Sequence, residues 1–148
     1  MKAPKVEFSY SLGYLTVVTG RMFASTFGRK IAEAGLDVTM EQWSILRILL
    51  NEDGCTQESI LRLTYYEKST LSRILEGLER KGLIERRRGA ADGRRKEVFL
   101  TSRGFDIGVS GTSVVLALLE KLYESVDPAE LDQCRAMLSL MQTRLLTM

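Results

Sequence analysis

The chain has 148 residues and is 45% hydrophobic, which suits one globular domain and argues against disorder. Its formal net charge is only +2, it contains no histidine and two cysteines, and no apolar run approaches the roughly 20 residues that span a bilayer. This composition lacks the commonest general base and metal ligand and a disulfide framework, so we expect a cytosolic protein that is not an enzyme, has no cofactor or metal and does not bind membranes.

Two helices are predicted in the first third of the chain. The first runs from about Ser9 to Ala34, with an apolar stripe at helical spacing formed by Leu15, Val18, Met22, Phe27 and Ile31. A capping box then begins the second helix, because the Thr39 hydroxyl can bond the Gln42 amide while the Gln42 side chain reaches back. That helix ends near Asn51 and carries Trp43, Leu46, Leu49 and Leu50.

The centre of the chain has the pattern of a winged helix. A short helix beginning at Thr56, with Ile60 and Leu63 facing inward, precedes a helix over residues 68–80. At 3.6 residues per turn, one face of the longer helix is apolar (Leu71, Ile74, Leu75, Leu78) and the other polar (Ser69, Arg73, Glu76, Arg80). Two predicted strands, 84–88 and 98–100, then flank an arginine-rich loop. A helix can enter a major groove while such a cationic ribbon reaches the neighbouring minor groove.

Two more helices follow. Thr101 is predicted to cap one that runs to about Glu124, and Asp127-Pro128-Ala129-Glu130 is a strong start signal for the last. Cys134 in that last helix is predicted to be buried packing. We therefore predict a mostly α fold with a small β-wing, divided into an N-terminal dimerisation helix (1–36), a winged helix-turn-helix domain (37–100) and C-terminal dimerisation helices (101–148).

The apolar stripes of the terminal helices predict a homodimer. They are too extensive to be covered by so small a central domain, and a second copy of the chain is the favoured partner. The alternative is a monomer in which the three terminal helices fold back on the core.

The polar face of the 68–80 helix predicts contacts with double-stranded DNA. Hydroxyls of its first turns can bond bases and phosphates, and Arg73 can make a bidentate contact to guanine or clamp a phosphate. Capping is the alternative role for Ser69 and Ser72. Glu76 could accept from a cytosine amine, but an ion pair with Arg73 or Arg80 is favoured.

The loop between the predicted strands has a tight-turn signal, Asp92-Gly93, followed by Arg94. An arginine at such a tip suits a narrow minor groove, and Asp92 could hold it in an extended rotamer. Arginines on either side, including Arg87 and Arg88, would bind phosphates where they face outward. The complete predicted DNA-binding set is Thr56, Gln57, Lys68, Ser69, Thr70, Ser72, Arg73, Arg80, Arg86, Asp92, Arg94, Arg95 and Lys96.

Nearly the whole chain resembles MarR-type transcriptional regulators. The matching segments are Gly35-Leu36, Thr39-Met40-Glu41-Gln42-Trp43, Thr56-Gln57, Lys68-Ser69-Thr70-Leu71-Ser72-Arg73, Leu78-Glu79-Arg80-Lys81-Gly82-Leu83-Ile84, Asp92-Gly93-Arg94-Arg95 and Leu100-Thr101-Ser102-Arg103-Gly104. The resemblance implies a dimer built from the terminal helices, a palindromic operator and, usually, release from DNA by a small aromatic effector. It implies that Ser69, Thr70, Ser72 and Arg73 enter the major groove and Arg94 the minor groove.

The chain departs from that family pattern in two places. Tyr65-Tyr66 stands before the recognition helix, where the family more often has glycine and an aliphatic residue. The fifth helix is crowded with glycines, Gly104, Gly108 and Gly111, although each costs about 1 kcal/mol in a helix interior. They could allow close packing across the dimer or mark a kink beside an effector cleft.

Regulation by a ligand and regulation by oxidation are both open from the sequence. A cleft for a small aromatic carboxylate would be lined by Tyr14, Met22, Phe23, Phe27, Trp43 and Arg47, although these residues also fit an ordinary core. A redox switch would use Cys55, whose pKa the start of the third helix could lower. Repression is the favoured mode of action over activation, and a protein-interaction module on the same fold is the alternative to DNA binding.

Overall fold

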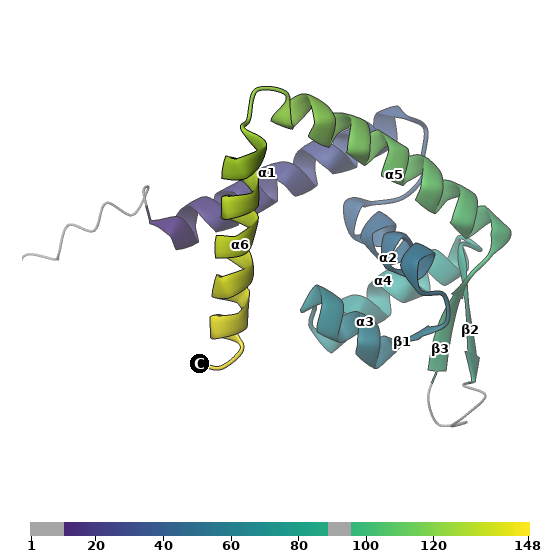
Figure 1. Cartoon of the computed structure of the whole chain (residues 1–148). Coiled ribbons are helices and arrows are strands. Elements are labelled where there is room, and N and C mark those ends of the chain that lie inside the picture. The colour runs from purple at the N-terminus through teal and green to yellow at the C-terminus, as the bar shows by residue number, and fades with distance from the viewer. Residues whose placement is uncertain (1–10, 89–95) are drawn as a thin grey trace, which may run out of the picture. The chain divides into compact units, whose positions relative to one another are not determined.

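The structure is a computed structural model of the chain and describes residues 11–88 and 96–148. Figure 1 shows its helices and strands in sequence order. They are α1 (Leu12–Glu33), α2 (Met40–Asn51), β1 (Cys55–Thr56), α3 (Gln57–Thr64), α4 (Lys68–Arg80), β2 (Ile84–Arg88), β3 (Lys96–Leu100), α5 (Ser102–Tyr123) and α6 (Pro128–Leu145). The predicted fold class, mostly helical with a small β-wing, is confirmed.

Helix starts follow local sequence signals closely. The capping box of α2 forms as predicted: the Gln42 amide donates to Thr39 Oγ1 over 3.2 Å, and the Thr39 amide donates to Gln42 Oε1 over 3.2 Å. The Thr101 hydroxyl accepts from the Gly104 amide at the start of α5, and Asp127 caps α6 through the Ala129 amide. These bonds satisfy amide groups that a helix start leaves without an intrahelical partner.

The three strands form one antiparallel sheet in the order β1-β3-β2. Strands β2 and β3 make the hairpin, with Ile84 opposite Leu100 and Arg88 opposite Lys96. The sequence prediction began β3 two residues too late and missed β1, which pairs Cys55 with Val98. A two-residue strand has no periodicity to detect, because only its pairing partner defines it.

The core lies around α2, which packs against α1, α4 and β3. Its fully buried side chains are Ile31, Ile45, Leu46, Leu49, Ile60, Leu71, Leu75, Leu78, Leu83, Ile84 and Val98. The inward position predicted for Leu63 is wrong, since this side chain is 61% exposed. Helix α3 ends at Thr64, so Leu63 lies in its last turn, and Ile60 is the residue of α3 that is buried in the core.

The glycines of α5 allow a close approach within the chain. A Cβ at Gly104 would overlap the Leu83 carbonyl oxygen, one at Gly108 would lie 3.1 Å from Leu50 Cδ1, and one at Gly111 would lie 2.7 Å from Trp43 Nε1. Helix α5 is continuous over these positions. The glycines therefore pack α5 against the rest of its own chain, a role that neither sequence hypothesis included.

The chain divides into two compact units, residues 1–115 and 116–148. The division falls inside α5, and the predicted domain boundaries after residues 36 and 100 stay predictions. In the second unit α6 has no buried residue, and Cys134 is exposed, so its predicted burial is wrong for the single chain. The described helices include none that is long and apolar enough to cross a membrane.

Candidate nucleic-acid interface

Helix α4 has the two faces that its spacing predicts. The apolar face, Leu71, Ile74, Leu75 and Leu78, is buried against the core. On the other side Ser69, Arg73, Glu76 and Arg80 are exposed, while Thr70 and Ser72 are half-buried. Burial of one face fixes the helix on the domain and leaves the other available to a partner.

The first turn of α4 has no side-chain cap. The N-cap residue is Glu67, and it makes no capping hydrogen bond, so the capping role considered for Ser69 and Ser72 is wrong. The Ser72 hydroxyl instead donates to Glu76 Oε1 over 2.9 Å. Among the residues in the structure, Glu76 forms no ion pair with Arg73 or Arg80, so that prediction is wrong; its described side-chain partner is the Ser72 hydroxyl one turn earlier.

The turn that presents α4 is strained. Tyr65 ends α3 in the left-handed region, with φ 55° and ψ 23°, a conformation that costs a residue other than glycine about 1–2 kcal/mol. Its side chain is 64% exposed. Tyr65 thus adopts the left-handed turn geometry that glycine favours, although it stands where the family more often has glycine. Its side chain adds a large aromatic group to the surface beside α4.

A hollow of about 510 Å³ lies on one side of α4. It contains four of the predicted DNA-binding residues, Thr56, Gln57, Lys68 and Lys96, beside Glu58, Leu61 and Leu71. Thr56 is also the N-cap of α3, where its hydroxyl oxygen accepts from the Ser59 amide over 3.1 Å. The first turns of α3 and α4 and the start of β3 thus bring these four residues together.

A second hollow, of about 520 Å³, lies between α4 and the start of α2. It is lined by Thr39, Glu41, Gln42, Tyr66, Thr70, Arg73, Ile74, Gly77 and Arg80. Three predicted DNA-binding residues, Thr70, Arg73 and Arg80, meet here. Within the described chain, neither arginine forms an ion pair, so both guanidinium groups can bind an external anion.

The described arginines of the wing differ in what they contact. Arg86 is engaged by Glu79 of α4: its Nε lies 3.0 Å from Glu79 Oε2, and its terminal nitrogen contacts the same oxygen. Arg87 pairs with Glu85 and lies over the Phe99 ring, 4.8 Å from its centroid. Arg88 is exposed. Asp92, Arg94 and Arg95, which are also predicted to bind DNA, lie outside the described residues.

The Glu79–Arg86 pair attaches β2 to the recognition helix. Hydrogen bonding to Arg86 lowers the pKa of Glu79, and the same contact raises the pKa of Arg86, whose side chain is only 20% exposed. Arg86 therefore holds the wing against α4 more directly than it offers charge to a phosphate.

Glu79→Gln should reduce the stability of the fold in a pH-dependent way. Because the pKa of Glu79 is lowered from 4.5, its contribution is complete above about pH 4.5 and is lost as the pH falls through the lowered value. Glu79 is 40% exposed, so screening limits the effect at pH 7 to about 0.5–1 kcal/mol. Denaturant unfolding of both proteins at pH 7 and near pH 3 would check this, and a difference that persists unchanged at low pH would contradict it.

Lys81 forms an anchor that the sequence analysis missed. Its ammonium group donates to the Asp37 carbonyl over 2.7 Å, to Asp37 Oδ1 over 3.0 Å and to Gln42 Oε1 over 3.3 Å. The end of α4 is thereby fixed to the start of α2. From the sequence, Lys81 was recognised only as part of the signal that ends the helix, because its hydrogen-bond partners are far away along the chain.

The described hollows at α1, α2, α4 and α5 each include no more than one of the six residues of the predicted effector cleft. Phe27 and Trp43 are buried, and the Phe23 and Phe27 rings are 5.3 Å apart. Met22 is 64% exposed, whereas Tyr14 lines a hollow on α1 that includes none of the other five. Arg47 donates to Asn51 over 2.5 Å. Trp43 packs directly on Gly111, where an added Cβ would lie 2.7 Å from Trp43 Nε1.

The pKa of Cys55 is shifted in the opposite direction to the one predicted. It is buried in β1, and its thiol donates to the Glu52 carbonyl over 3.0 Å. Burial raises the pKa of this thiol, and the charges of Glu52 and Asp53 add to the increase. The predicted lowering by the α3 N-terminus is therefore wrong, since loss of water outweighs the helix.

Helices α3 and α4 and the hairpin together define the class of this protein as a winged helix-turn-helix. A model of the MarR family matches residues 35–95. The transcriptional regulator HosA of Escherichia coli is 34% identical over 68 residues, which are 46% of this chain and 50% of HosA. The chain thus spans about half the length of the curated relatives that it matches.

Solved structures extend the similarity over nearly the whole chain. The DNA complex of S. aureus MepR has a TM-score of 0.82 and 30% identity, covering 92% of this chain and 99% of that one. A MarR transcriptional regulator from Methanosarcina mazei has a TM-score of 0.79 and 26% identity, with coverages of 92% and 96%. The chain belongs to the MarR family of transcriptional regulators.

Proposed function

We propose that the protein is a homodimeric transcriptional repressor that binds a palindromic operator through α4. The observation that carries this proposal is the outward face of α4, where Arg73 and Arg80 have no ion-pair partner among the described residues and are flanked by hydroxyl groups. A face of this composition suits base edges and phosphates. That S. aureus MepR, a 30% identical relative, was crystallised with DNA supports the proposal.

The predicted contacts divide by their position around α4. Thr70 and Arg73, with Ser69 and Ser72, would face the major groove. Residues of the two flanking hollows, Thr56, Gln57, Lys68, Arg80 and Lys96, would bind the backbone on either side. Arg94 keeps the minor-groove role that the family resemblance implies, Asp92 would hold it in an extended rotamer, and Arg95 would bind a phosphate where it faces outward. Arg86 would act by holding the wing in place.

The terminal helices support a dimer. Leu12, Leu15, Val17 and Met22 of α1 are exposed, and so are Met137, Leu138, Leu140 and Leu145 of α6. Large aliphatic side chains gathered at this density on two helices favour association with a second copy. Two-fold symmetry would then match the two halves of a palindromic operator.

An aromatic effector would act near Trp43. The Trp43 Nε1 group is buried and has no hydrogen-bond partner among the described residues, which is an unfavourable state for a polar group. A carboxylate or phenol oxygen brought by a ligand would satisfy it. The ligand would have to displace side chains there, and such a displacement would link binding to a change in the position of α5 or α2.

Binding of the purified protein to its own upstream DNA over a salt series tests this function. The expected result is saturable protection of one site with dyad symmetry, with an affinity that falls steeply as salt increases. Binding no tighter than to random DNA would contradict operator recognition and favour the interaction module. Sedimentation of the free protein would test the dimer separately.

A further inference from the structure

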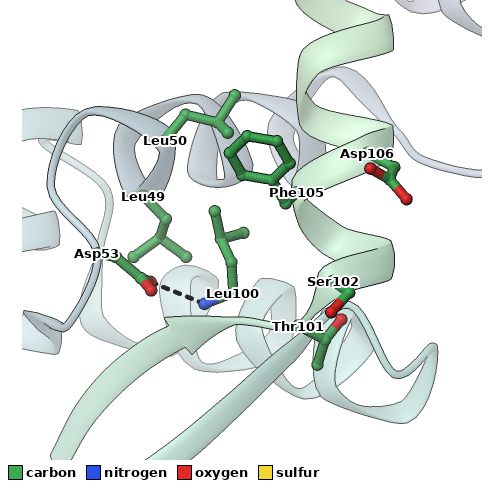
Figure 2. A pocket seen from close by; sticks show the side chains of 8 residues that line it. All are labelled: Leu49, Leu50, Asp53, Leu100, Thr101, Ser102, Phe105 and Asp106. Atoms are coloured by element: carbon green, nitrogen blue, oxygen red, sulfur yellow. Dashed lines mark hydrogen bonds between the residues drawn. The ribbon is translucent and has the colours of Figure 1, made fainter.

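The turn between α2 and β1 is bonded to the far end of the hairpin. The Leu100 amide, at the last residue of β3, donates to Asp53 Oδ1 over 2.8 Å, the dashed line in Figure 2. Beside this bond, the Gly54 amide donates to the Val98 carbonyl over 3.0 Å. Asp53 and Leu100 are 47 positions apart in the sequence. The Asp53 bond therefore fixes one segment of the fold relative to another, and is not a local capping interaction.

The Asp53 side chain extends the attachment of β3 beyond the end of β1. Strand β1 has only two residues, and its pairing with β3 reaches Cys55 opposite Val98. Just before Cys55 the chain turns, because Gly54 adopts φ 81°. The carboxylate of Asp53 then accepts the amide of Leu100, two residues further along β3 than Val98. A side-chain oxygen thus holds β3 where the short strand no longer does.

The same turn also contacts the hairpin through Phe99. A Cβ at Gly54 would lie 2.8 Å from Phe99 Cε1, so the ring can reach the turn only because residue 54 has no side chain. Arg87 of β2 lies over this ring, 4.8 Å from its centroid. The turn at residues 53 and 54 therefore contacts β3 directly and is linked to β2 through one aromatic ring.

The other bonds at the base of the hairpin act within the hairpin itself. The Thr101 hydroxyl donates to the Gly82 carbonyl over 2.7 Å, and the Thr101 amide donates to the Leu83 carbonyl over 3.1 Å. These two bonds join the end of β3 to the start of β2. Among the described residues, Asp53 supplies the side-chain hydrogen bond that joins this base to the turn after α2.

We propose that Asp53 is a positioning residue for operator binding, which fixes the base of the wing relative to α2. Asp53 touches no DNA in this role. It restricts the orientations of β2 and β3, so less order is lost when α4 and the wing bind neighbouring grooves. The Glu79–Arg86 pair holds β2 to α4, and Asp53 holds β3 from the other side of the domain core. The effect on DNA binding rests on the proposed function, whereas the attachment of the wing does not.

Operator binding by three variants tests this role. Asp53→Ala removes the acceptor oxygen and should lower operator affinity about fivefold. Asp53→Asn keeps an acceptor oxygen in the same place and should bring the affinity back to within about twofold of the unmodified protein. Glu52→Ala is the matched control, because it removes an exposed carboxylate one residue away and should not lower affinity. Asp53→Asn binding as weakly as Asp53→Ala would overturn the role of the acceptor oxygen.

A fourth variant separates a positioning role from general damage to the fold. In a protein that already lacks Arg94, the residue predicted to enter the minor groove, Asp53→Ala should cause little further loss of affinity, because its effect acts through the wing. An equal loss with and without Arg94 would overturn the positioning role. So would an Asp53→Ala protein that binds the operator as tightly as the unmodified one.

Hydrogen exchange in the free protein tests the attachment without DNA. The Leu100 amide should exchange faster in Asp53→Ala than in the unmodified protein or in Asp53→Asn. Unchanged exchange at Leu100 would overturn the attachment. If exchange depends on residue 53 and the unmodified protein binds no operator, the proposed function fails and the attachment of the wing stands.

Discussion

Replacing Gly104 with alanine should lower the free energy of unfolding by about 3 kcal/mol, at the upper end of overpacking effects. The new Cβ would overlap the Leu83 carbonyl oxygen and stand 2.9 Å from the carbonyl carbon. This carbonyl cannot rotate away as a flexible side chain would, because it is backbone and accepts the Thr101 amide over 3.1 Å. The start of α5 would have to move, and the buried contacts at Leu83 and Leu100 would be lost.

Gly20→Ala is the matched control for this experiment. Gly20 lies in the interior of α1, and a Cβ there would meet nothing within 4 Å. This change should stabilise the protein by about 0.5–1 kcal/mol, since alanine has the higher helix propensity. Urea unfolding of the two variants at one protein concentration would measure both effects, with concentration held constant in case association contributes to stability. Equal midpoints would show that α5 does not approach Leu83 as closely as the structure indicates.

The contrast between these two glycines shows what sequence reasoning could predict. Both are glycines within helices, and no local pattern distinguishes Gly20 in open space from Gly104 against a backbone carbonyl. The capping box at Thr39 was predictable because its donor and acceptor are three residues apart. The same is true of the apolar face of α4, whose spacing repeats along one helix.

Sequence reasoning could not predict the contacts between residues that are distant along the chain. Arg86 has the sequence context of a phosphate ligand, but the hairpin brings it to Glu79. Lys81 bonds Asp37, and strand β1 exists only through β3. Cys55 was predicted to have its pKa lowered by the start of α3, because the sequence did not show the strand that buries it. These residues depend on tertiary packing, which overrides local propensity.

Arg73→Ala should have the largest effect on operator binding of any single change in the described part of α4. Arg73 is exposed, and within the described chain no carboxylate pairs with it. Its guanidinium can therefore bind DNA without first breaking an ion pair. A bidentate guanine contact contributes about 1–3 kcal/mol. Two copies in a dimer would lose about 2–6 kcal/mol, a fall in affinity of about 30-fold or more. Fluorescence anisotropy with the operator identified by footprinting would measure it.

The control is Arg135→Ala in α6, another exposed arginine, which pairs with Asp132 and is predicted to have no DNA contact. If both changes reduce affinity equally, Arg73 contributes only general positive charge, and the major-groove proposal for α4 fails.

The salt dependence separates the two ways in which Arg73 could act. Loss of a phosphate contact lowers the slope of log affinity against log salt by about 0.9 for each copy, whereas loss of a guanine contact leaves the slope unchanged and relaxes the base preference at one position of each half-site. Because a two-fold dimer places Arg73 in both half-sites, that relaxed position must occur twice, symmetrically about the operator centre.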